Sequence, residues 1–198
     1  MGESLLFFME RKRDMVEKKL KICVTVGHSI LKNGACTSAD GRKYGGVLEY
    51  KYCKDFARLY LVPQLKKAGH TVDLIICPEK QFQTKYEERG YKVPKVNAGG
   101  YDLLLELHLN AATPSATGTE VYYYSESGKK YAEAICKQLG KVYKNRGAKK
   151  DKKLYILNST KPTAVLLELF FCTNREDYLK GHGKKNATNL AKLIAQAI

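Results

Sequence analysis

Four side chains stand out because their types could bind a metal ion and move a proton: His28, Glu49, His108 and Glu168. Two histidines and one carboxylate are a usual protein ligand set for catalytic zinc, with a fourth position left for water. A further glutamate close to that water can act as a general base. Plainer interpretations remain, because a histidine at a strand end can simply be hydrogen-bonded and an acid such as Glu49 suits any helix N-terminus.

The element that must position His108 is the apolar run of residues 101–111, YDLLLELHLNA, which is bounded by glycines and by Pro114. Its length and composition predict a strand buried on both faces. Alternation along a strand divides the side chains into a leucine face, residues 103, 105, 107 and 109, and a second face that carries Asp102, Leu104, Glu106, His108 and Asn110. In an open α/β sheet, polar residues at the carboxyl end of a strand lie where ligands bind.

The other three residues occupy comparable places. His28 follows a predicted strand at 21–26, and Glu49 lies in the first turn of a helix predicted over 47–68, which Pro63 should kink or split. Glu168 is the one acid in a strand predicted over 164–171, and we expect Leu166 and Phe170 to flank it on the same face and raise its pKa.

The remaining pattern predicts strands at 72–77, 119–124 and 154–157, a helix at 128–143, one helix within 83–97, and C-terminal helix over 174–198 broken near 181–183. Strands that alternate with helices indicate an α/β fold. We predict a single twisted, mostly parallel (mixed) sheet with helices on both faces, formed by residues 21–198 after an N-terminal extension, residues 1–20.

The net charge of +15 indicates a polyanionic partner, such as nucleic acid or an anionic wall polymer. No nucleic-acid-binding motif accompanies the charge, so we expect no nucleic acid partner. No apolar run approaches the roughly 18 residues that a membrane span needs. The apolar patch at residues 5–9 is too short for a signal peptide, and its basic residues follow it, so we expect a chain made in the cytoplasm without an export signal. The six cysteines form no C-x-x-C pair, and several fall in predicted strands, where a reduced cysteine acts as a small hydrophobic residue, so we expect a reducing compartment during folding.

Several common catalytic motifs are absent: H-E-x-x-H, G-x-S-x-G, the P-loop and G-x-G-x-x-G. The motifs that are present are VGH at 26–28, Glu49 at a helix start, DLLLELHLNA at 102–111, NRGAK at 145–149 and KPTAVLLE at 161–168. In their order and spacing from residue 21 to residue 198, they resemble the zinc-dependent N-acetylmuramoyl-L-alanine amidases of the amidase-3 type. In particular, the chain is similar to endolysin catalytic domains from clostridial phages and prophages.

This resemblance implies zinc (Zn2+) on His28, Glu49 and His108, with Glu168 as the catalytic acid and base. It also implies hydrolysis of the amide between the lactyl group of N-acetylmuramic acid and L-alanine of the stem peptide. The partner would be peptidoglycan, with anionic wall polymers held by the basic surface, and we expect a monomer that acts on the cell wall after release.

Three further residues within these motifs are candidates for supporting roles. Asn110 and Lys161 are candidate substrate or oxyanion contacts because of their positions in the sequence. Glu106 departs from the family pattern, which often has a small or hydroxyl residue there; it either supports His108 from behind or competes as the base. Two other functions stay open: a zinc peptidase or carboxypeptidase acting on the stem peptide, and a polyanion-binding module without chemistry.

Overall fold

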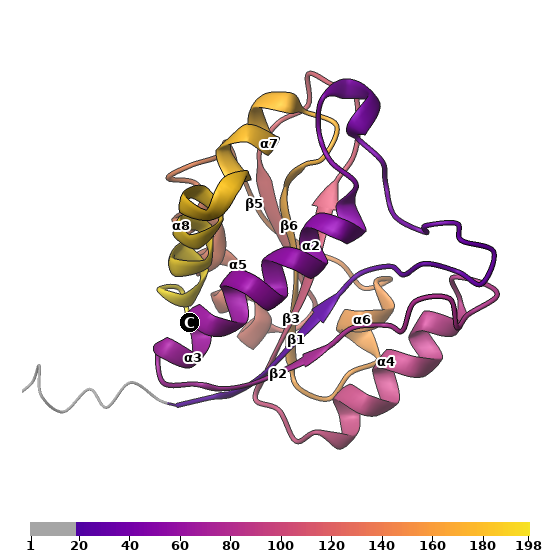
Figure 1. Cartoon of the computed structure of the whole chain (residues 1–198). Helices are drawn as coiled ribbons and strands as arrows, with labels where there is room; N and C mark the ends of the chain where they lie inside the picture. The colour runs from indigo at the N-terminus through magenta and orange to yellow at the C-terminus, as the bar shows by residue number, and fades with distance from the viewer. Residues whose placement is uncertain (1–18) are drawn as a thin grey trace, which may run out of the picture.

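The computed structural model describes residues 19–198, which form a six-stranded sheet in the order β2-β1-β3-β6-β4-β5 (Figure 1). Residues 1–18 of the predicted extension at 1–20 lie outside the described residues. Leu20, at the end of that predicted extension, packs in the core. The strands are β1 (Lys21–Val26), β2 (Thr71–Ile75), β3 (Leu103–Asn110), β4 (Thr119–Tyr123), β5 (Asn145–Lys150) and β6 (Thr163–Phe171).

Four neighbouring strands of the sheet, β2, β1, β3 and β6, are parallel, while β4 is antiparallel to β6 and parallel to β5. The predicted mixed α/β sheet is therefore confirmed. Because β1, β3 and β6 run the same way, their carboxyl ends meet at one edge. His28, His108 and Glu168 all lie toward that edge.

Helices cover both faces of the sheet, as predicted (Figure 1). The larger core lies under α2 (Glu49–Phe56), η2 (Ala57–Leu61), α3 (Val62–Lys67), α5 (Glu126–Leu139) and α8 (Gly183–Ala195), with α7 (Arg175–Gly181) leading into α8 and η1 (Arg42–Tyr44) preceding α2. The smaller core lies under α4 (Glu87–Ala98) and α6 (Tyr155–Asn158). Within residues 19–198, no helix has the length and apolar character to cross a bilayer, and all six cysteines are unpaired.

Two local predictions were wrong. Residues 154–157 were predicted as a strand, but they belong to the turn and helix around α6, because the carboxylate of Asp151 accepts hydrogen bonds from the backbone N–H groups of Lys153 and Leu154 and turns the chain. The apolar side chains of residues 154–157 therefore pack against the sheet, but they do so from this turn and helix and not from a strand. The strand β5 was missed because its sequence, NRGAKK, is polar, as an exposed edge strand can be.

The long helix at 47–68 is divided, as the prediction from Pro63 allowed. A π-helical turn, η2, separates α2 from α3, and the N–H of Val62 donates to the carbonyl of Ala57 five residues earlier. Pro63 lies in the first turn of α3, where a residue without an N–H is tolerated. Glu49 begins α2 as predicted.

An irregularity between β3 and β6 changes the surroundings of Glu168. His108 pairs with Glu168, but Asn110 pairs with Phe171, so β6 carries one extra residue between these pairs. The bulge reverses the alternation beyond Glu168. Phe170 therefore packs against Tyr52 and Tyr143, with ring centroids 4.9 Å and 5.6 Å away, in the larger core. The expectation that Phe170 flanks Glu168 was wrong.

Candidate metal centre and its cleft

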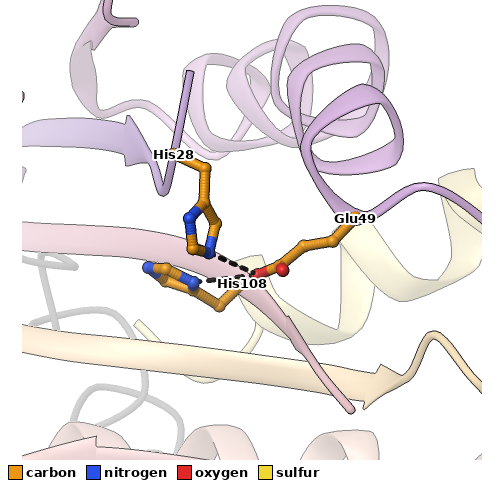
Figure 2. Close-up of side chains that lie close together, drawn as sticks. All are labelled: His28, Glu49 and His108. Carbon is orange, nitrogen blue, oxygen red and sulfur yellow. Dashed lines mark hydrogen bonds and ion pairs between the residues drawn. The ribbon is translucent and has the colours of Figure 1, made fainter. Parts of the chain in front are cut away.

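His28, Glu49 and His108 converge at the carboxyl edge of the sheet (Figure 2). The Oε1 atom of Glu49 lies 3.2 Å from Nε2 of His28 and 2.9 Å from Nδ1 of His108. One potential ligand atom from each of the three residues lies within 4.8 Å of the others. The sequence separates them widely, so the fold brings together the set predicted from residue types.

The backbone around His28 is specialised for this approach. His28 has φ of 68°, in the left-handed region that a residue with a side chain adopts at a cost. Gly27 precedes it, and a Cβ there would lie 2.0 Å from the imidazole of His108. The turn after β1 therefore requires glycine at 27 so that the two histidine rings can lie 4.9 Å apart, edge to face.

Glu49 is buried and fully oriented. Its Oε2 accepts a hydrogen bond from the N–H of Ala39 at 3.0 Å, and its Oε1 also accepts one from the N–H of Leu109 at 3.1 Å. Burial opposes ionisation, but hydrogen bonds and charge attraction from His108 and His28 outweigh it and lower the pKa of Glu49. The residue therefore presents an ionised carboxylate to the two imidazoles.

His108 lies between two carboxylates. Its Nδ1 is near Glu49, and its Nε2 lies 3.3 Å from Oε1 of Glu106. Burial disfavours the charged imidazole, but hydrogen bonds to Glu106 and Glu49 raise the pKa of His108 to about 10. A metal ion that binds Nδ1 must therefore replace a proton.

Glu106 is itself part of a buried ion pair. Its Oε1 lies 2.9 Å from Nζ of Lys92, and its Oε2 accepts a hydrogen bond of 2.6 Å from the hydroxyl of Thr25. Burial opposes its ionisation, but attraction to Lys92 and hydrogen bonds from His108 and Thr25 lower the pKa of Glu106. Glu106 therefore contacts the ring nitrogen of His108 that does not face Glu49.

Glu168 lies beside His108 across the sheet and beside Glu120 on its other side. Within the described chain, its Oε2 atom is buried and has no hydrogen-bond partner. Burial raises the pKa of Glu168 to about 7, and the negative charges of Glu49 and Glu120 add to the shift against an opposing effect of His108. A carboxyl group with such a pKa can accept and later donate a proton near neutral pH.

A cleft of about 660 Å³ opens onto these residues. One wall is formed by α4 and the residues just before it, the other by α6, and the floor includes His28, His108, Glu106, Glu168 and Leu166. The walls contribute three cations and two aromatic rings: Lys85, Arg89, Lys153, Tyr86 and Tyr155. The cleft therefore joins the polar cluster to a basic, partly aromatic surface.

Neither of the two predicted substrate contacts, Asn110 and Lys161, is among the residues that line this cleft. The side-chain amide of Asn110 donates to Glu120 at 2.8 Å, beside Arg146 and Lys149, which also bind Glu120. Its role as a substrate contact stays a prediction. Lys161 precedes the amino end of β6, where Thr163 pairs with the first residue of β3, so the structure does not bring Lys161 to the site.

Sequence reasoning missed the buried partners of the predicted residues. Lys92 and Glu88 are buried on α4, within a segment whose charges look like those of a solvated helix. Glu88 accepts hydrogen bonds from Ser29 and Thr37, which secures the loop that follows His28. Their four-residue spacing places Glu88 and Lys92 on one helix face, which was the available signal.

The profile of the N-acetylmuramoyl-L-alanine amidase family matches residues 22–198. Among solved structures, the catalytic domain of an endolysin targeting Clostridia difficile is 60% identical, with a TM-score of 0.82, over 90% of this chain and 96% of that one. The catalytic domain of an amidase from Bacillus (Paenibacillus) polymyxa, 19% identical with a TM-score of 0.73 over 91% of this chain and 96% of that one, shares the fold.

Curated relatives are longer. "Probable autolysin PH" of Staphylococcus aureus is 32% identical over 100% of this chain and 42% of its own length. An uncharacterized protein of Clostridium perfringens is 31% identical over 90% of this chain and 51% of its own length. The chain thus spans about half the length of these relatives or less.

Proposed function

Since the chain belongs to the N-acetylmuramoyl-L-alanine amidase family, we propose that it hydrolyses the amide between the lactyl group of N-acetylmuramic acid and L-alanine in peptidoglycan. The observation that carries this proposal is the convergence of His28, Glu49 and His108 beside the cleft whose lining includes His28, His108 and Glu168, the last with an unpartnered carboxylate oxygen.

The three converging residues would hold zinc. Two imidazoles and one carboxylate are a ligand set of catalytic zinc, and Glu49 is buried and ionised here. The Oε2 atom of Glu168 has no partner among residues 19–198, which supports a further polar group at this place. When bound, zinc would lower the pKa of a water molecule and polarise the scissile carbonyl.

Glu168 would carry the protons. Its Oε2 accepts a proton from the attacking water and then delivers one to the nitrogen of L-alanine as the amide bond breaks. The raised pKa of about 7 suits both steps, because both the charged and the neutral form of the Glu168 carboxyl group are populated near neutral pH. Glu168 suits this role better than Glu106, because both oxygens of Glu106 already bind Lys92, Thr25 and His108.

The cleft would receive the stem peptide. Lys85, Arg89 and Lys153 supply positive charge along its walls, which suits carboxylate groups of an acidic peptide. The net charge of +15 would add attraction to anionic wall polymers.

Two measurements on the purified protein test this function. We expect about one zinc per chain, lost in His28→Ala and His108→Ala, and digested walls should gain free alanine α-amino groups without new reducing sugar ends. Active protein that holds no zinc after chelator washing would refute the metal assignment. New amino groups on another residue would indicate a peptidase, and wall binding without any cleavage would indicate a polyanion-binding module.

A further inference from the structure

Lys92 is a buried cation at the back of the metal centre. Its side chain is 0% exposed, although it comes from the middle of α4. Lysine is rarely fully buried, and a buried charge is costly unless it is paired. The Nζ atom of Lys92 meets that requirement by contacting Oε1 of Glu106 at 2.9 Å and donating to the carbonyl of Val26 at 3.2 Å.

Those two contacts reach both strands that present a histidine. Val26 ends β1 and is followed by Gly27 and His28, whereas Glu106 lies on β3, two residues before His108. The hydroxyl of Thr25 closes the connection by donating from β1 to Glu106. The ammonium group of Lys92 on α4 thus contacts both β1 and β3 near the ends that present the histidines.

We propose that Lys92 is a positioning residue that, through Glu106, fixes the imidazole of His108 and holds the β1 end that carries His28. The proposal rests on the proposed function, because it assumes that the two histidines hold zinc. It concerns a residue outside the predicted ligand set.

The geometry gives the mechanism. Glu106 receives Lys92 and His108 on Oε1 and Thr25 on Oε2, so its carboxylate has one orientation. A fixed acceptor 3.3 Å from Nε2 of His108 orients the imidazole ring so that Nδ1 faces Glu49 and the proposed metal position. Without Lys92, Oε1 of Glu106 would lose its ionic partner, and the carboxylate would no longer be held in one orientation toward His108.

The test is zinc affinity, measured by competition with a chromophoric chelator on folded protein. We expect Lys92→Met to weaken zinc binding by about ten- to a hundredfold, the usual effect of losing a group that orients a ligand. Removing the positive charge of Lys92 leaves more net negative charge at the site, which by itself would attract the zinc cation. Unchanged or tighter zinc binding would therefore overturn the proposal.

A double variant separates a coupled pair from two independent residues. Glu106→Gln leaves Lys92 as a lone cation beside the site and should also weaken zinc binding. Adding Lys92→Met to Glu106→Gln removes that cation and should recover zinc affinity several-fold. If the two losses multiply instead, the residues act independently and the proposal fails. This comparison also stands if Lys92→Met alone does not fold.

A matched control comes from Asp177, another buried carboxylate, on α7, which accepts hydrogen bonds from Thr117 and the N–H of Gly118. Asp177→Asn should lower the melting temperature but leave zinc affinity unchanged. If Asp177→Asn lost as much zinc affinity as Lys92→Met, the effect of the Lys92 substitution would be explained by general destabilisation of the fold. If the unmodified protein binds no zinc, the proposed function fails; if it binds zinc and the Lys92 variants match it, only this inference fails.

Discussion

At the scale of single residues, Glu168 differs from the other acids of the site because its buried Oε2 is unpartnered within residues 19–198. Glu168→Gln keeps the shape and removes the proton acceptor, so we expect turnover on cell walls to fall by about 10²-fold or more while zinc is retained. Glu133→Gln, at an exposed glutamate on α5, is the matched control and should be fully active. Full activity in Glu168→Gln would mean that another group is the base.

The same residue should reduce the stability of the metal-free protein. A carboxyl group whose folded pKa is raised contributes stability below its unfolded pKa, near 4.5, and loses it as pH rises through about 7. In excess chelator at pH 8, the unfolding free energy of Glu168→Gln should therefore exceed that of the unmodified protein by on the order of 1–3 kcal/mol, seen as a higher melting temperature, and the difference should shrink toward pH 5. Thermal melts that show the same difference at both pH values would contradict this.

At the scale of elements, the turn after β1 determines how closely the histidines approach. The Cβ of Gly27→Ala would lie 2.0 Å from His108, so the imidazole must move, and we expect zinc affinity to fall at least tenfold. Gly90→Ala on α4 is the control, because its Cβ meets nothing within 4 Å and alanine favours a helix by about 1 kcal/mol. Tight zinc binding by Gly27→Ala would show that the turn adapts.

The same scale shows how far sequence could go. Apolar runs and their bounding glycines were sufficient to predict β1, β3, β6 and the place of Glu49, because burial on both faces leaves a clear pattern. Edge strand β5 and helix α6 escaped because one is polar and the other is only four residues long. The bulge in β6 depends on contacts between distant segments, which no local pattern records. The four-residue spacing of Glu88 and Lys92 indicates a shared helix face, but it does not indicate that this face is buried.

At the scale of the whole molecule, the charge of +15 should control adsorption to the wall. Attraction between surface charges is screened over roughly 8–10 Å at physiological salt. Binding to purified walls should weaken steeply between low and physiological ionic strength, and walls stripped of anionic polymers should show a shallower dependence. Binding that is constant across this range would leave solubility as the role of the charge.

The order of strands in the sheet has a consequence for how the chain acquires its structure. The central pairs join distant segments: Thr25 on β1 contacts Glu106, 81 residues away, and Leu103 pairs with Thr163 across β3 and β6. Such high contact order slows folding, because long loops must close before the pairs form. β1 and β3 can pair once residue 110 has been made, but the other edge of the leucine-rich β3 stays without its partner strand until synthesis has passed β6.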